Sequence, residues 1–190
     1  MTYVVELLRQ EHRNIEKLLR ILERELAVFD RGDRPNYELV VAIIDYFKDY
    51  PDTCHHPKED MIFDKLKSRD PAAAANIGDL HTEHDEGASR LRRAAQAVER
   101  VLGDQDLLRE TVDEIIRDFV ERERHHMKME EQIFFPTALD VLQPKDWADI
   151  ALKLADRREP LYGSDIDQKF SVLRRKILEI DAEAEAERLA

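Results

Sequence analysis

Residues 77–102, IGDLHTEHDEGASRLRRAAQAVERVL, carry the most regular apolar pattern of the chain. Apolar or histidine side chains recur there at alternating steps of four and three positions, which is the period of an α-helix with one buried face. The stretch therefore predicts a helix that packs inside a bundle and turns two histidines toward its interior. The positions are Ile77, His81, His84, Ala88, Leu91, Ala95, Val98 and Leu102.

Three other segments have the same helical period and would complete a bundle. The first includes His12 in its apolar stripe, the second contains Pro51 and Pro57, and the fourth leads to His126. Each proline removes a backbone donor, so we expect a kink or a restart in the second helix. Short turns join the segments, and together they predict an all-α fold, an antiparallel up-and-down four-helix bundle. The turns lie at residues 31–35, 68–71 and 103–106.

The chain divides into two predicted regions. Residues 1–140 contain the four helical segments and all of the histidines, and residues 141–190 form a C-terminal helical extension. The extension has one more apolar stripe, which either the bundle or a second subunit must cover. A homodimer through the C-terminal helix is therefore one of the two expected arrangements. The stripe consists of Ile166, Phe170, Leu173, Ile177 and Ile180.

Composition excludes several classes of protein. Charged residues make up 38% of the chain and its net charge is −12, which disfavours nucleic acid as a partner. The N-terminal segment has charges within its apolar pattern, so we expect neither a signal peptide nor a membrane span, and a cytoplasmic location. Cys54 is the only cysteine, which rules out an internal disulfide and a cysteine-based zinc cluster.

The same pattern of histidine and glutamate occurs twice. His12 is followed 43 positions later by the His55-x-x-x-Glu59 motif, and His84 is followed 42 positions later by His126-x-x-x-Glu130. Residues four apart on a helix project from one face, so each motif presents an imidazole and a carboxylate together. Two such sets on helices that close on one another predict a metal site with two ions.

Burial strengthens this interpretation. The helical phase places Glu59 and Glu130 among apolar side chains, where an unpaired carboxylate costs several kcal/mol. Neutral imidazoles do not supply the missing positive charge, whereas a pair of metal ions does. Neighbours on a helix differ by about 100°, so only one member of each histidine doublet faces inward. The spacing to the glutamates selects His55 and His126 and leaves His56 and His125 on the outer face.

The predicted ligands are His12, His55, Glu59, His81, His84, His126 and Glu130. Imidazole and carboxylate suit iron, manganese or zinc, and we favour two iron ions because such a set leaves a coordination position free. Apolar residues beside it would form a dry pocket for a small diatomic ligand or peroxide. The competing ferritin-like carboxylate bundle is disfavoured, because the first and third helices offer histidine where it needs glutamate. The pocket residues are Ile15, Phe47, Ile62, Ala88, Phe119 and Ile133.

The motifs resemble the hemerythrin family, in particular the bacterial hemerythrin-like, HHE cation-binding domains. The matching segments are Glu11-His12, residues 55–63 (HHPKEDMIF), Glu83-His84, and residues 126–136 (HMKMEEQIFFP). The resemblance implies a di-iron pair in a four-helix bundle, with four terminal histidines (His12, His55, His84, His126) and two bridging glutamates (Glu59, Glu130). Oxygen-carrying members have two histidines four apart on the third helix, whereas His81 and His84 are three apart. They also end the site with Asp five positions after the last histidine, where this chain has Glu130 at four.

Three functions follow as hypotheses. The first is a di-iron protein that reversibly binds or senses oxygen, nitric oxide or peroxide, or handles iron, without organic substrate. The second is an enzyme, either a low-turnover peroxidase or a factor that delivers iron for repair of nitrosative damage. The third is a structural or interaction bundle with zinc or no metal. An imidazole-rich site favours ligand binding over catalysis, so we place the first hypothesis ahead of the others.

Overall fold

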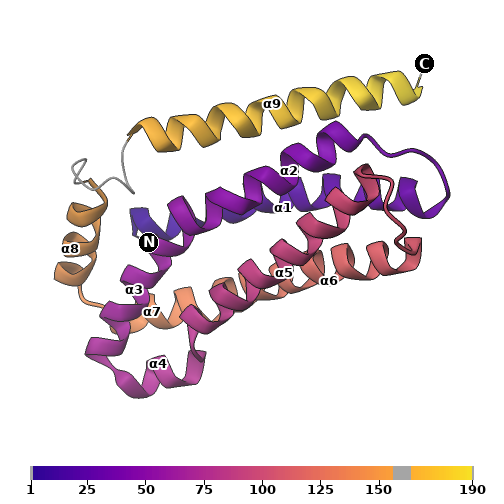
Figure 1. Cartoon of the computed structure of the whole chain (residues 1–190). Helices are drawn as coiled ribbons and strands as arrows, with labels where there is room; N and C mark the ends of the chain where they lie inside the picture. Colours follow the sequence, from indigo (N-terminus) through magenta and orange to yellow (C-terminus); the bar gives the residue numbers. More distant parts are fainter. Residues whose placement is uncertain (1, 156–163, 190) are drawn as a thin grey trace.

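Long α-helices run alternately up and down the molecule (Figure 1). The computed structural model describes residues 2–155 and 164–189. Its longer helices are α1 (Tyr3–Asp30), α2 (Tyr37–Tyr50), α3 (His56–Arg69), α5 (Leu80–Leu102), α6 (Arg109–Met129) and α9 (Ser164–Leu189). Its shorter helices are α4 (Pro71–Ile77), α7 (Phe135–Val141) and α8 (Pro144–Ala155). Two π-helical turns, η1 (Pro51–His55) and η2 (Glu130–Phe134), lie within the bundle.

The predicted fold class is confirmed. No β-strand occurs within residues 2–155 and 164–189, and four antiparallel rods form the bundle. The first and third rods are the single helices α1 and α5. The second rod consists of α2, η1 and α3, and the fourth of α6, η2 and α7 (Figure 1).

Side-chain caps and glycines set the helix boundaries. Asn36 accepts a hydrogen bond from the backbone N–H of Leu39 at the start of α2, which satisfies one of the donors left free at a helix N-terminus. Gly32 adopts a φ of 88° after α1, a value that glycine tolerates best. Gly78, with a φ of 106°, separates the unpredicted short helix α4 from α5. Consequently α5 begins at Leu80 rather than at the first apolar position of the predicted stripe.

Each π-helical turn lies just before a proline. Pro57 follows η1 and Pro136 follows η2, in each case as the second residue after the turn. Proline lacks the N–H that a regular α-helix needs and its ring clashes with the carbonyl four residues back. In η1 the N–H of His56 instead donates to the carbonyl of Pro51, five residues back, and η2 has the equivalent bond. The predicted break in the second rod is therefore one wide turn, and the fourth rod contains another.

The apolar core consists of two clusters separated by a polar layer. On α1, Leu8 belongs to one cluster, Ile15 to the other, and the buried His12 lies between them. The first cluster includes Val5, Ile62, Phe63, Leu66, Phe134, Phe135 and Trp147. The second includes Leu19, Leu22, Leu39, Phe47, Ala94, Phe119 and Val120. The polar layer contains six of the seven predicted metal ligands.

Helix α9 packs against α2 along one side of the bundle (Figure 1). Phe170 and Ile177 of the predicted apolar stripe are buried, and the side chain of Ile166 lies outside the described residues. Arg188 forms two hydrogen bonds of 2.8 Å with the fully buried carboxylate of Glu25 on α1. The bundle thus covers this stripe, while a homodimer through α9 and the division at residue 140 stay predictions. In the part of the chain that the structure describes, no helix is both long enough and apolar enough to cross a membrane.

Candidate metal centre

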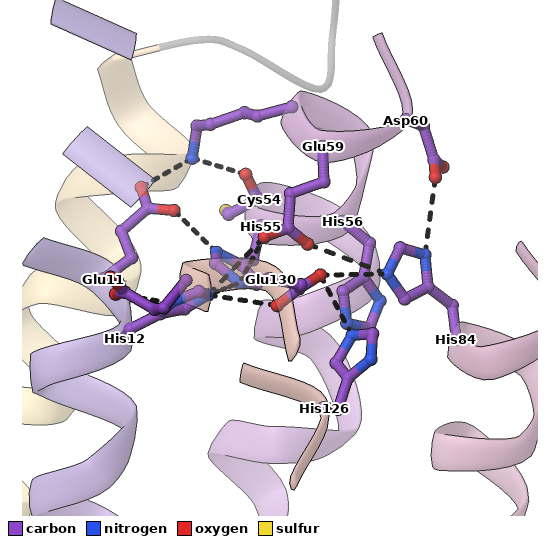
Figure 2. A network of polar contacts seen from close by, with 12 residues as sticks. Glu11, His12, Cys54, His55, His56, Glu59, Asp60, His84, His126 and Glu130 are labelled. Atoms are coloured by element: carbon purple, nitrogen blue, oxygen red, sulfur yellow. Dashed lines mark hydrogen bonds and ion pairs between the residues drawn. The ribbon is translucent and has the colours of Figure 1, made fainter. Parts of the chain in front are cut away.

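The polar layer brings five histidines and two glutamates together at the middle of the bundle (Figure 2). They form two adjoining groups, in each of which the potential ligand atoms lie within 4.8 Å of one another. The inner subsite consists of His12, His55, Glu59 and Glu130, and the cleft subsite of His56, Glu59, His84 and His126. All four rods contribute at least one of these residues.

The inner subsite is enclosed. His12 and His55 are at most 4% exposed, and their Nε2 atoms lie 3.1 Å apart. The Nε2 atom of His12 lies 3.5 Å from Oε1 of Glu59 and 3.3 Å from Oε2 of Glu130. Ligand atoms bound to one ion at about 2.1 Å and about 90–110° apart are separated by about 3.0–3.4 Å. The four donor atoms are therefore already close to the spacing that a single metal ion requires.

The cleft subsite contains three imidazoles. The rings of His56 and His84 stack with centroids 3.8 Å apart, and the ring of His126 stands nearly perpendicular to that of His84. The Nε2 atom of His84 lies 3.7 Å from Oε2 of Glu59, and that of His126 lies 3.2 Å from Oε1 of Glu130. The first of these separations is wider than any quoted for the inner subsite, so His84 and Glu59 would move slightly closer around an ion.

Each glutamate divides its two oxygens between the subsites. Oε1 of Glu59 lies 3.3 Å from Nε2 of His55, whereas its Oε2 faces His84. Glu130 does the reverse, with Oε2 toward His12 and Oε1 toward His126. Figure 2 shows both carboxylates between the two sets of rings. This is the placement of two carboxylates that bridge a pair of ions.

A carboxylate lies behind every imidazole of the centre. Each ring turns Nδ1 toward an acidic side chain within 3.4 Å, which fixes the tautomer with hydrogen on Nδ1 and a free lone pair on Nε2. Such carboxylate–histidine pairs typically orient the histidines of metal sites. The pairs are Glu131 with His12, Glu11 with His55, Asp52 with His56, Asp60 with His84, and Glu83 with His126.

Several polar atoms at the centre are buried without a well-formed hydrogen bond to any described residue. They are both carboxylate oxygens of Glu59 and of Glu130 and the Nε2 atoms of His84 and His126. Nitrogen atoms approach them at 3.2–3.9 Å, but at poor angles for hydrogen bonding. Buried polar atoms of this kind are rare in folded proteins and call for an ion or another partner. The residues present therefore fit a pair of bound cations.

The pKa values of the buried histidines also indicate that the two glutamates require positive charge nearby. Burial lowers the pKa of His12, but the close carboxylates of Glu130, Glu131 and Glu59 outweigh it and raise the pKa to about 12. Burial is likewise outweighed at His84, whose pKa rises to about 9 beside Asp60 and Glu130. Complete burial lowers the pKa of His55 to about 3. Without metal, protons on the imidazoles compensate the two buried glutamates.

A buried ion pair supports the inner subsite from behind. Lys58, on α3, donates to Oε1 of Glu11 at 2.7 Å and to the backbone carbonyl of Cys54. The other oxygen of Glu11 lies 2.8 Å from Nδ1 of His55. Burial raises the pKa of the Glu11 carboxyl, and the Lys58 ammonium partly opposes that effect. The position of His55 is thereby tied to both α1 and α3.

The structure brings together six of the seven predicted ligands. His81 is half exposed and lies 3.2 Å from Asp60 and 3.6 Å from Asp64, outside both subsites. Because α5 begins at Leu80, His81 occupies the first turn of the helix and His84 alone reaches the layer. His81 is therefore separated from the centre by Asp60, which also contacts His84.

His56 is a residue that the sequence analysis placed on the outer face, and that prediction was wrong. The π-helical turn η1 lies directly before it and ends at His55. A turn of that kind advances each residue by less than the 100° of a regular helix, so His55 and His56 both point to the layer. The paired prolines were the signal for this irregularity. His125, the outer member of the second doublet, is exposed.

The second π-helical turn changes the prediction for Ile133. Alignment of the two glutamate motifs put Ile133 inward beside the site, but its side chain is 47% exposed, while Phe134 is fully buried. The shift arises because η2 begins at the ligand Glu130 and includes Ile133, whereas η1 ends before Glu59. The two motifs are thus alike at the histidine and glutamate and different beyond them.

A cleft of about 390 Å³ leads from the surface to the cleft subsite, where His56, His84 and His126 line it. Phe47, Ala88 and Phe119 of the predicted apolar pocket contribute to its walls. Ile15 and Ile62 instead belong to the two apolar core clusters. The cleft subsite can therefore receive a small ligand from outside.

Comparison with known proteins agrees with this geometry. Residues 3–138 match the Hemerythrin HHE cation binding domain family. Comparisons with curated proteins and with solved structures found no match. The matched region runs from α1 into α7 and includes every residue of both subsites. The chain therefore belongs to the hemerythrin HHE cation-binding domain family.

Proposed function

We propose that the protein holds two iron ions at the paired subsites and reversibly binds or senses oxygen, nitric oxide or peroxide there. The observation that supports this most directly is the division of the Glu59 and Glu130 oxygens between the subsites. With both glutamates bridging, the inner subsite offers two imidazoles and the cleft subsite three. Six-coordinate iron would keep a free position at each ion, and the cleft of about 390 Å³ leads to the one at the cleft subsite.

The residues around the free position suit a small ligand. Phe47 and Phe119 are almost completely buried beside the cleft, so the ligand would meet an apolar wall. Bound iron would supply the electrons that hold such a ligand. The protein's own contribution is to fix the imidazoles through their Nδ1 partners and to exclude bulk water from the inner side.

Metal content and an optical spectrum test this proposal. After anaerobic incubation with Fe²⁺ and removal of excess metal, we expect about two irons per chain by elemental analysis. We also expect new absorption between the near-ultraviolet and visible on exposure to air or azide. Two irons with no spectral change would reject ligand binding and leave iron storage or delivery. Less than half an equivalent of iron, zinc or manganese would reject the metal centre itself.

A further inference from the structure

The cleft that reaches the cleft subsite is strongly acidic. Arg90 and Arg122 are the arginines of its lining, and each also lies within 4 Å of Asp118, outside the cleft. Arg90 pairs with Glu86 of the lining at 2.8 Å. Carboxylates still outnumber guanidinium groups by five to two, so the local potential attracts cations. The acidic residues of the lining are Asp52, Asp79, Glu83, Glu86 and Glu123.

The negative charge continues to the bottom of the cleft. Asp52 contacts His56 at 3.1 Å and Glu83 contacts His126 at 3.0 Å. His84 lies beside them, only 8% exposed, with a buried Nε2 that has no hydrogen-bonding partner among the described residues. A cation moving down the cleft would thus meet carboxylates first and then the Nε2 atom of His84, an atom that suits a metal ligand.

A glycine keeps this route open. Gly87 lies in the cleft lining, within the regular helix α5, where glycine is a poor helix former. A Cβ atom at this position would have no heavy atom within 4 Å, so close packing does not require glycine. A larger side chain here would instead project into the cleft.

The opposite approach to the centre has the reverse charge. A second hollow lies beside His12, which is itself 4% exposed. Its acidic residues are Glu16 and Glu131, and its basic residues outnumber them. Cations are repelled from this side, so the two approaches are not equivalent. The basic residues are Arg13, Lys17, Arg20, Arg124 and Lys128.

We infer that divalent cations enter the protein through the acidic cleft, guided by Glu123, and occupy the cleft subsite before the inner subsite. This inference rests on the proposed function, because it names the route to the same centre. Glu123 is the best single residue with which to test it. Its substitution breaks no ion pair, since the described residues hold no charged partner within 4 Å of it.

Charge reversal at the cleft tests the route. Metal-free full-length protein is mixed with Co²⁺, and the rate at which its visible absorption develops is followed. We expect Glu123→Lys to slow uptake about three- to tenfold at low salt, with the difference shrinking as salt is added and the final stoichiometry unchanged. Glu121→Lys is the matched control, because Glu121 is exposed on the same helix, carries the same charge change and does not line the cleft.

A bulky, uncharged side chain that obstructs the cleft provides a second test of the route. Gly87→Phe should slow Co²⁺ uptake by a factor similar to or larger than that of Glu123→Lys, whereas Gly87→Ala should leave the rate close to that of the wild type. Circular dichroism melts establish that each variant is folded. If Gly87→Phe does not fold, the lysine pair decides the question alone.

The outcomes separate the route from the function. Two bound ions with equal uptake rates for Glu123→Lys, Glu121→Lys and wild type would overturn the route and leave the proposed centre intact. A slower rate in Lys17→Phe, on the basic side, with unchanged Glu123→Lys kinetics would also overturn it. A wild-type protein that binds no metal would overturn the proposed function together with the route.

Discussion

The inner and cleft subsites share the same two glutamates but differ in almost everything around them. The inner subsite is enclosed by Phe135 and the Lys58–Glu11 ion pair, with its donor atoms already about 3 Å apart. The cleft subsite has three imidazoles, wider spacing and an opening to the surface. The comparison teaches that nearly identical helical motifs produce one position suited to holding an ion and one suited to exchange.

Removal of a shared glutamate should have the largest effect, because it damages both subsites at once. We expect Glu130→Ala to bind less than one metal ion per chain. Its metal-loaded form should lose the stabilisation that binding gives the wild type, about 4 kcal/mol per ion at a thousandfold excess over the dissociation constant. Elemental analysis and thermal melts measure both effects, with Glu121→Ala as an exposed control on the preceding helix. Full occupancy in Glu130→Ala would show that this carboxylate is not a bridge.

Substitution of single histidines should distinguish the metal binding of one subsite from that of the other. His84→Ala is expected to lower the metal content from about two ions to one and to abolish the spectral response to azide. His12→Ala should also lose one ion, but the remaining ion should still lie beside the cleft and respond to azide. Elemental analysis paired with azide titration distinguishes the two. Identical azide behaviour in both variants would mean that access does not differ between the subsites.

His56 provides a smaller and more specific test. If it completes the cleft subsite, His56→Ala should weaken the binding of one ion about 10- to 100-fold and leave the second unchanged. The range is what loss of a supporting interaction typically costs at a metal site, and loss of a ligand should cost at least as much. Competition with a chelator measures the affinity. His125→Ala is the matched control, and equal losses from both variants would show that η1 does not select His56.

The smallest expected effect is a dependence on pH. The pKa of His84 is raised to about 9 and that of His126 to about 11, so in metal-free protein both rings carry protons at pH 7 that metal must displace. A raised folded-state pKa stabilises the metal-free protein most below about pH 6.5, the unfolded value, and this stabilisation declines as pH rises toward 9. The increase in melting temperature on metal addition should therefore grow from pH 6 to pH 8. An increase that stays constant or shrinks would contradict this assignment of protons.

The sequence predicted the rods and most of the centre because both depend on a regular helical period. Leu8, His12 and Ile15 have the burial that this period predicts. The sequence-based prediction failed where the helical period changes, at His56 beside η1 and at Ile133 within η2. His81 was misplaced for a different reason, since Gly78 delays the start of α5. Local backbone irregularities of one residue are enough to move a side chain from one face to another.

The carboxylates that orient the imidazoles could not be predicted from spacing alone. Glu11 and Glu131 are neighbours in sequence of His12 and Glu130, yet each serves a histidine on a different rod. Such pairs depend on how the rods are rotated against one another, which the apolar stripe fixes only approximately. The covering of Glu25 by Arg188 is likewise a contact between distant segments.

The polar layer between the two apolar clusters also bears on the cooperativity of folding. Each cluster has its own set of large buried side chains. The two clusters meet at the polar layer, where the buried charges must be balanced for the two halves of the bundle to pack stably. Ions bound in the polar layer would cross-link the two halves of the bundle. Loss of the ions would let the halves open with different free energies, so that amide hydrogen exchange in the two ends of α1 would become unequal.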